Sequence, residues 1–431
     1  MKCDRCGVES EVEQAFTVKK KWAGLMSERW CPKCVRANES REQLTAVILV
    51  ALGLIALDAL TYQRGPVRVL LDLGFLVAVN IPIVVAHELA HVVAGILLGV
   101  RVFRVMFGSG RRLASGRAFG ITWEWRLWPF SGGTVMACPP QRGNRARFFG
   151  AVLAGPMLHA FLLLAAIAFQ FFLLILQDGF GVNVELLLHW TGLFITFDLI
   201  ILLFNLLPRR AKGSSGRIGT DGWQLLHLLF MKPDEEAVRA QGFFVAGSME
   251  ALLRNDVNEA LRWTDQGLAR HPRQPALLAV RGETLIKKKR FAEARDLFVE
   301  LLATKGAQDP LYKYLMYNNI AYVDVLLGDP ELLPEADRYS AEARRQLPWE
   351  PSIAGTRGTV LLALDRLDEG MAMLQQALAE QKTNHAKAED AYHLAAGEER
   401  RGDAEAARRY RELARKYEPD LFLLQGDEGE S

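Results

Sequence analysis

Two histidines and a glutamate stand together in the pattern His87-Glu88-x-x-His91. Histidines four positions apart lie on one face of a helix, where their ring nitrogens can bind a single metal ion. Glu88 follows the first histidine directly, so its carboxylate can take a proton from an attacking water and pass it to the leaving amine. This spacing is typical of hydrolytic zinc enzymes.

The surroundings of this motif favour a metal over a chance pentapeptide. The three ionisable residues lie inside the apolar stretch 67–100. A charged residue at the centre of a membrane helix costs roughly 2.5–3.5 kcal/mol on insertion scales, which a bound cation offsets and a structural role does not. A catalytic zinc also needs a third protein ligand and one open position. Spacing alone leaves five candidates for that ligand: Asp198, Asp221, His159, His189 and His227.

Four of the five cysteines form two C-x-x-C pairs near the N-terminus, Cys3 with Cys6 and Cys31 with Cys34. Two such pairs suit a tetrahedral structural zinc, because thiolates are soft ligands and each pair reaches the metal from one turn. Two disulfides or redox-active pairs are the alternatives. Zinc thiolates favour a reducing, cytosolic environment. Cys138 stands alone and is interpreted as a small interface residue.

The composition divides the 431-residue chain into two halves. Long apolar runs dominate residues 44–207, whereas the chain from about 233 is charged and rich in Ala and Leu. This division predicts a membrane half followed by a soluble half. The net charge of +2 does not indicate nucleic acid as a partner. The first 40 residues are polar, which does not fit a cleavable signal peptide.

Four apolar stretches are long enough to cross a bilayer: 44–60, 67–100, 148–176 and 186–207. Lys and Arg gather before the first stretch, between the second and third, and after the fourth, while 177–185 has none. The positive-inside rule therefore predicts a multi-pass protein of a cell membrane, bacterial by our interpretation, with both termini in the cytosol.

A short segment between the second and third stretches has the period of a strand. Residues 120–127 alternate strictly between apolar and polar side chains, and 102–107 is a suitable partner. Our hypothesis is that 119–137 forms a sheet edge that pairs with an unwound substrate. The alternative is a hairpin that only docks on the bilayer, where its tryptophans would prefer the interface.

In chain order, these features resemble the site-2 protease family of intramembrane metalloproteases, over roughly 81–229. The resemblance is carried by five motifs, which are His87-Glu88-Leu89-Ala90-His91, Gly132-Gly133, Ala154-Gly155-Pro156, Phe204-Asn205-Leu206-Leu207-Pro208 and Asp221-Gly222.

The resemblance implies roles for individual residues. Asp221 would be the third zinc ligand, Asn205 would help to hold the substrate or the oxyanion, and Gly132 and Gly133 would bind substrate. The chain departs from the family in a basic insert at 209–220. It also departs at His159 and Asp198, two positions where the family usually or often has Asn. We expect His159 to be a packed or hydrogen-bonded neighbour of the site.

From about 241 onward a pattern repeats. Glu followed by a small residue recurs at intervals of 34, 42, 34 and 36 residues, in Glu259-Ala260, Glu293-Ala294, Glu335-Ala336, Glu369-Gly370 and Glu405-Ala406. A period near 34 with paired helices resembles tetratricopeptide (TPR) repeats, and the longer interval fits an insert around 328–334. Such arrays present a concave surface to peptides or proteins. A purely structural or dimerising array is the alternative.

Together these patterns predict a mainly α protein. Its expected parts are a zinc-ribbon-like module at 1–40, a four-span membrane core with a small hairpin at 41–232, a TPR-like α-solenoid at 233–425 and an acidic, disordered tail at 426–431. The predicted function is that of an intramembrane zinc metalloendopeptidase with a catalytic and a structural Zn²⁺. It would cut membrane-protein substrates and bind a cytosolic protein or peptide through its repeats. The alternatives are a non-catalytic membrane adaptor and a zinc transporter or sensor.

Overall fold

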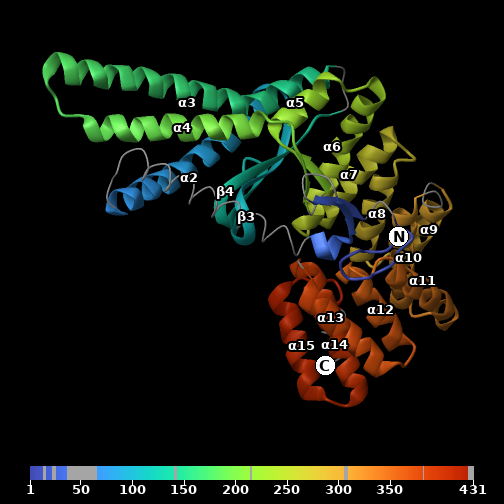
Figure 1. Ribbon diagram of the computed structural model, residues 1–431. Helices are drawn as coiled ribbons and strands as arrows, with labels where there is room; N and C mark the ends of the chain where they lie inside the picture. Colours follow the sequence, from blue (N-terminus) through green and yellow to red (C-terminus); the bar gives the residue numbers. More distant parts are fainter. Residues whose placement is uncertain are drawn as a thin grey trace. The chain divides into compact units, whose positions relative to one another are not determined.

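The computed structural model places most of the chain in helices (Figure 1). The described residues fall into two compact units, one made of Met1–Ala46 with Asn255–Ser431 and the other of Val47–Arg254. The mainly α class predicted from the sequence is confirmed. The description covers the whole chain except 13–15, 22–25, 36–65, 140–142, 214–215, 305–308, 382 and 426–431.

Three helices of the second unit are long and apolar enough to span a membrane. They are α2 (Pro66–Leu97), α3 (Asn144–Phe180) and α4 (Glu185–Leu206). Helix α3 packs against both α2 and α4, and it runs alongside α4 in Figure 1. Their outward side chains are apolar and exposed, as expected for contact with lipid. The expected span at 44–60 and the expected acidic tail lie outside the described residues.

A sheet of two long, bent strands follows α2. Strand β3 is Arg101–Ala118 and strand β4 is Ile121–Ala137. Gly108 and Gly110 adopt the left-handed region, with φ of 89° and 82°, where β3 changes direction. Because only glycine takes that conformation at little cost, these residues allow one strand to contribute to two parts of the sheet.

The pairing of β3 and β4 produces a sheet of four segments, in which the register of 101–107 is antiparallel to 132–137 and parallel to 122–125. Residues 101–107 pair on one side with 132–137 and on the other side with 122–125, and 112–118 pair with 121–126. The expected partnership of 102–107 with the alternating segment is therefore present. Among the described pairings, 132–137 has a strand on one side only and forms an edge of the sheet.

Helices cover both faces of this sheet. Val105, Phe107 and Ile121 form an apolar cluster with Val92 of α2 on one face. The other face contacts α6 (Pro233–Leu253), the first helix after the membrane core.

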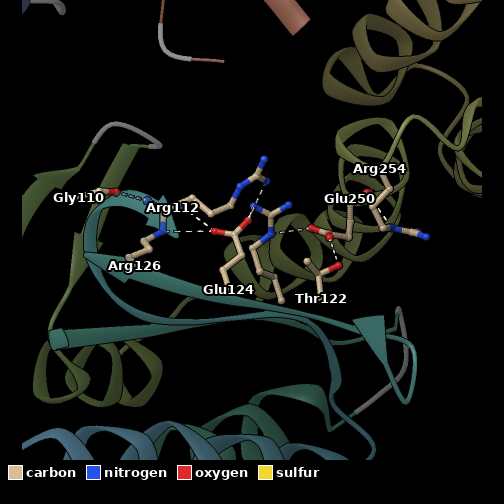
Figure 2. A network of polar contacts seen from close by, with 8 residues as sticks. Gly110, Arg112, Thr122, Glu124, Arg126, Glu250 and Arg254 are labelled. Carbon is tan, nitrogen blue, oxygen red and sulfur yellow. Dashed lines mark hydrogen bonds and ion pairs between the residues drawn. The ribbon is translucent and has the colours of Figure 1, made fainter. Parts of the chain in front are cut away.

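A buried polar network fastens α6 to the sheet (Figure 2). Arg104 donates to Glu124 at 2.8 Å and to Glu250 of α6 at 3.0 Å. Thr122 also donates to Glu250, and Arg126 donates to Glu124 at 2.8 Å. Buried carboxylates are tolerated when charged donors satisfy them, as these two are. The network therefore ties α6 to the same sheet that has the 132–137 edge.

The basic insert forms a small hairpin between α4 and the next helix. Strand β5 (Arg210–Gly213) pairs with β6 (Gly216–Gly219), and α5 (Asp221–Leu229) follows. Thr220 caps α5 by accepting from Trp223 N, and its hydroxyl donates to the Leu207 carbonyl at 2.7 Å. Gly222 lies so close to the Leu206 backbone that a Cβ would not fit there. The insert thus leaves the start of α5 held at the end of α4.

The first unit contains an array of antiparallel helix pairs. Each pair from α8 onward turns through one residue with positive φ, namely Lys289, Gly328, Asp365 or Gly402. Small residues allow close approach, and Gly282 has Phe298 where a Cβ would lie. The helices are α7 (Val257–Arg270), α8 (Pro275–Lys287), α9 (Phe291–Ala303), α10 (Pro310–Leu327), α11 (Leu333–Gln346), α12 (Pro351–Ala363), α13 (Leu367–Glu380), α14 (Asn384–Arg401) and α15 (Ala404–Tyr417). The expected insert contains the short 3-10 helix η4 (Pro330–Leu332).

The N-terminal cysteine-bearing segment packs on this array within the same unit. It contains the hairpin β1 (Thr17–Lys21) and β2 (Met26–Trp30). Its Phe16 and Trp30 share an apolar cluster with Tyr314, Leu347 and Ile353 of the repeats. Ser10 donates to the Gln346 carbonyl at 2.6 Å, and Glu11 N donates to the Gln346 side chain at 2.7 Å.

Candidate active site

Three side chains from two elements converge in the membrane unit. His87 and His91 lie one turn apart on α2, and Asp221 begins α5. The two Nε2 atoms are 3.1 Å apart, and Asp221 Oδ2 lies 3.1 Å from His87 Nε2 and 3.5 Å from His91 Nε2. All three side chains are at most 12% exposed. The structure therefore brings together the three residues predicted as metal ligands.

The outer nitrogens of both histidines have partners of their own. His91 Nδ1 lies 2.8 Å from the Ala151 carbonyl, which can only accept, so His91 carries its proton on Nδ1. His87 Nδ1 lies 3.1 Å from His159 Nε2. Both Nε2 atoms are left facing Asp221, which is the arrangement in which a partner on one ring nitrogen orients the other toward a metal.

The three donor atoms fit a zinc ion. Ligands about 2.0–2.1 Å from a tetrahedral zinc lie about 3.3 Å from one another, close to the spacing observed here. Asp221 Oδ2 is buried and makes no hydrogen bond within the described part of the chain, as expected for an atom that awaits another partner. Gly155 of α3 lies against both imidazoles, where any Cβ would collide with the rings.

The carboxyl group of Asp221 is held in its ionised form. Burial alone would raise its pKa, but the adjacent imidazoles of His87 and His91 outweigh burial and lower the pKa to about 2. A carboxylate is the form that binds a metal.

The proposed base, Glu88, lies between the histidines in sequence and contacts the edge of the sheet. It is 5% exposed, and Thr134 Oγ1 donates to Glu88 Oε2 at 2.7 Å. Gly132 lies directly against the Glu88 side chain, so a Cβ at this position would collide with it. A Cβ at Gly133 would instead lie at an ordinary van der Waals distance from the Met106 side chain. Thr134 was not predicted, because no pattern distinguishes one edge threonine from another.

Asn205 lies near the end of α4, where its neighbour Leu206 contacts Gly222. Chain connectivity therefore brings it close to the start of α5. Its expected role in holding the substrate or the oxyanion remains a prediction.

Two of the remaining ligand candidates, His189 and His227, pair with other residues. His189 Nε2 pairs with Asp72 Oδ2 at 2.9 Å, and His227 lies 3.9 Å from Glu235. His159 and Asp198 do adjoin the site, but behind His87. His159 Nδ1 lies 2.6 Å from Asp198 Oδ1. The sequence signalled both residues only as departures from the family pattern, without indicating that they pair.

The four N-terminal thiols form a second cluster. The Sγ atoms of Cys3, Cys6, Cys31 and Cys34 all lie within 4.8 Å of one another, and the pair from Cys6 and Cys31 is 3.6 Å apart. Sulfurs about 2.3 Å from a tetrahedral zinc are about 3.8 Å apart, so the spacing fits. The described cysteines form no disulfide. Cys138 is buried elsewhere, beside the Asn144 carbonyl.

The fold combines three helices long and apolar enough to span a membrane with an array of helical repeats. Residues 74–178 match the family model described as Peptidase family M50, which spans most of α2, the sheet and most of α3. The resemblance to site-2 proteases is thereby confirmed for this segment. No curated protein matches the chain.

Several solved structures resemble the repeats. The TPR protein TTC0263 of Thermus thermophilus is 24% identical, with a TM-score of 0.36 over 43% of this chain and 96% of its own. MamA of Desulfovibrio magneticus is 16% identical, with a TM-score of 0.29 over 42% and 95%. YrrB, described as a TPR protein with an unusual peptide-binding site, is 18% identical, with a TM-score of 0.26 over 43% and 90%.

Proposed function

We propose that the protein is an intramembrane zinc metalloendopeptidase that hydrolyses peptide bonds of membrane-spanning substrates. The observation that carries the proposal is the convergence of His87 Nε2, His91 Nε2 and Asp221 Oδ2 beside Glu88. Two neutral imidazoles and a carboxylate supply three ligands and leave one tetrahedral position open, as catalytic zinc sites do.

Glu88 acts as the general base in this proposal. When bound, zinc supplies Lewis acidity that polarises the substrate carbonyl and the attacking water. Glu88 takes the proton of that water and delivers it to the leaving amine. Thr134 holds the Glu88 carboxylate in place through its 2.7 Å hydrogen bond. Asn205 is assigned to the substrate or the oxyanion.

The 132–137 edge is proposed to bind the substrate backbone. A helix must unwind before its carbonyls can be attacked, and pairing with a sheet edge replaces the hydrogen bonds that it loses. Support comes from the side of 132–137 that has no paired strand in the described part of the chain, and from the contact of Gly132 and Thr134 with Glu88. If Gly133→Pro left cleavage of a single-span substrate unchanged, edge pairing would be wrong.

The Cys cluster is proposed to hold a structural zinc, and the repeats are proposed to recruit a substrate or a regulator. Four thiols leave no open position for chemistry. Packing of Trp30 on Tyr314 and Leu347 supports a role for this metal in holding the module on the repeats. We also propose the division into 1–40, 41–232, 233–425 and 426–431, with four spans and both termini in the cytosol.

The decisive experiment uses full-length protein in detergent with a single-span substrate. We expect the wild type to cleave it, a chelator to stop cleavage, and added Zn²⁺ to restore cleavage. Glu88→Gln should keep its metal and lose cleavage. Asp178→Asn, an exposed acid at the end of α3, serves as the control.

The other functions give different results in the same preparation. A non-catalytic adaptor would show no cleavage in either the wild type or the Glu88→Gln variant, and its activity would reside in the repeats. A zinc transporter would move zinc into liposomes in a manner that depends on His87. Either result would overturn the protease proposal.

A further inference from the structure

Two buried residues behind the proposed ligands form a series of hydrogen bonds that ends on His87. His159 of α3 and Asp198 of α4 have side chains that are 1% and 0% exposed. His159 Nδ1 lies 2.6 Å from Asp198 Oδ1, and His159 Nε2 lies 3.1 Å from His87 Nδ1. The hydrogen bonds thus run from the Asp198 carboxylate through the His159 imidazole to His87 Nδ1. The other ring nitrogen of His87, Nε2, faces Asp221.

The Asp198 carboxylate, at one end of this series, sets the direction of the hydrogen bonds. The Asp198 carboxylate can only accept, so His159 carries its proton on Nδ1. A neutral imidazole has one N–H, so His159 Nε2 accepts from His87 Nδ1–H. His87 Nε2 then keeps its lone pair, which is what a metal ligand requires.

The same arrangement leaves the buried Asp198 carboxylate only partly compensated. Asp198 Oδ2 is buried and has no hydrogen-bond partner in the described part of the chain. An uncompensated carboxylate inside a membrane bundle is costly. A cation held by His87 and His91 supplies the compensating charge, and the carboxylate in turn favours the cation.

We propose that His159 and Asp198 are positioning residues that fix the tautomer and ring orientation of His87 for metal binding. This inference rests on the proposed function, because it assumes that His87 holds the ion. His91 obtains the same tautomer from the Ala151 backbone carbonyl, which a side-chain substitution does not remove. The two ligands are therefore fixed by different means, and only the means used for His87 can be mutated directly.

A second His–Asp pair in the same bundle provides a matched control. His189 Nε2 lies 2.9 Å from Asp72 Oδ2, and Trp190 also donates to Asp72. This pair links α4 to α2, and it includes none of His87, His91 and Asp221. Asp72→Leu therefore reports the general cost of breaking a buried pair in this bundle.

The experiment titrates metal-stripped, full-length protein in detergent with Zn²⁺ against a chromophoric chelator. The binding step that disappears in His87→Ala is assigned to the membrane site, which separates it from the Cys cluster. A parallel titration with Co²⁺ records the visible absorption of the ligand field. Thermal unfolding shows whether each variant is folded.

We expect His159→Leu and Asp198→Leu each to weaken the His87-dependent step by about 10–100-fold and to alter its Co²⁺ spectrum. The double variant should lose little more than either single variant, because the two residues act as one unit. His159→Asn should retain most of the affinity, since its amide oxygen can accept from His87 Nδ1–H. Asp72→Leu should leave this step unchanged.

Two results would overturn the inference. One is unchanged affinity and spectrum in both folded Leu variants. The other is an equal loss in Asp72→Leu, which would assign the effect to general disruption of the bundle. Absence of any His87-dependent binding in the wild type is a different outcome, because it would remove the proposed metal site itself.

Discussion

The two proposed metal sites differ in the number and kind of atoms that they offer. His87, His91 and Asp221 provide two nitrogens and one oxygen, whereas the Cys cluster provides four sulfurs. Three ligands leave a tetrahedral zinc open to water, and four thiolates close it. We therefore expect catalysis to depend on the site in the membrane unit, and metal-dependent stability to depend on the site in the repeat unit.

The neighbours of the two sites differ in the same sense. The membrane site is surrounded by groups that can move or orient a proton, including Glu88, Thr134 and His159. The Cys cluster is surrounded by apolar side chains such as Trp30, Tyr314 and Trp349. Perturbing the first site should therefore change rates, and perturbing the second should change unfolding.

The largest effect is expected for Asp221→Ala. Removal of the third ligand should release the membrane-site metal and lower cleavage by roughly 10³-fold or more, because the Lewis acid is worth several kcal/mol to the reaction. Unfolding of the repeat unit should be unchanged. Metal content and substrate cleavage are the measurements, with Asp178→Ala as the control. Full metal content in folded Asp221→Ala would exclude Asp221 as a ligand.

Cys31→Ser should have the opposite effect, because it should change unfolding of the repeat unit and not the membrane site. Loss of the structural metal removes a ligand of the folded state, which for a metal at 100–1,000 times its Kd is worth about 2.7–4.1 kcal/mol. The repeat unit should therefore unfold at lower denaturant, while the membrane-site metal remains. Cys138→Ser, outside the cluster, should change neither. If metal-free Cys31→Ser unfolded at the same denaturant concentration as the zinc-loaded wild type, a structural role for this metal would be contradicted.

The sequence predicted the local parts of both sites. His87 and His91 share a helix face because of the α-helical period alone, and each C-x-x-C pair is formed within one turn. Asp221 could be assigned only through the resemblance, since its position depends on packing of Gly222 against Leu206. The pairing of His159 with Asp198 joins two different helices, and no sequence period records such a contact.

The sheet was likewise predicted only in part from the sequence. Strict alternation predicted the strand at 120–127 and its partner at 102–107. The pairing of 101–107 with 132–137 continues the register of the hairpin formed by 112–118 and 121–126, whereas its pairing with 122–125 depends on bends at Gly108 and Gly110 that alternation cannot reveal. Docking of the N-terminal module on the repeats was also missed, because its apolar residues are scattered without a period.

Gly132→Ala tests how closely the base and the sheet edge fit. A Cβ at this position would lie 2.6 Å from the Glu88 side chain, whereas at Gly133 it would lie 3.5 Å from Met106. Displacement of a catalytic group by about 1 Å costs up to about 10²-fold. We therefore expect Gly132→Ala to lower kcat by about 10–100-fold with the metal retained. Gly133→Ala should change kcat far less, and equal effects would break the assignment.

The smallest effect concerns a titration in the repeat unit. Asp390 of α14 is 4% exposed and lies against Gly355 of α12. Burial raises its pKa to about 8, against a partial lowering by a hydrogen bond with Gln381. Because the folded pKa exceeds the unfolded value of about 3.9, its contribution to stability is complete below pH 4 and is lost as pH rises toward 8.

Wild-type repeats should therefore lose stability over this window relative to Asp390→Asn, with a slope of at most about 1.4 kcal/mol per pH unit. His393 acts in the opposite sense, because burial lowers its pKa to about 4, so its contribution is lost as pH falls below 6.5. It is present in both proteins and cancels in their difference. Pulse proteolysis of the full-length protein in urea measures that difference, with exposed Asp365→Asn as the control. A difference independent of pH between 4 and 8 would show that Asp390 is ionised in the folded repeats.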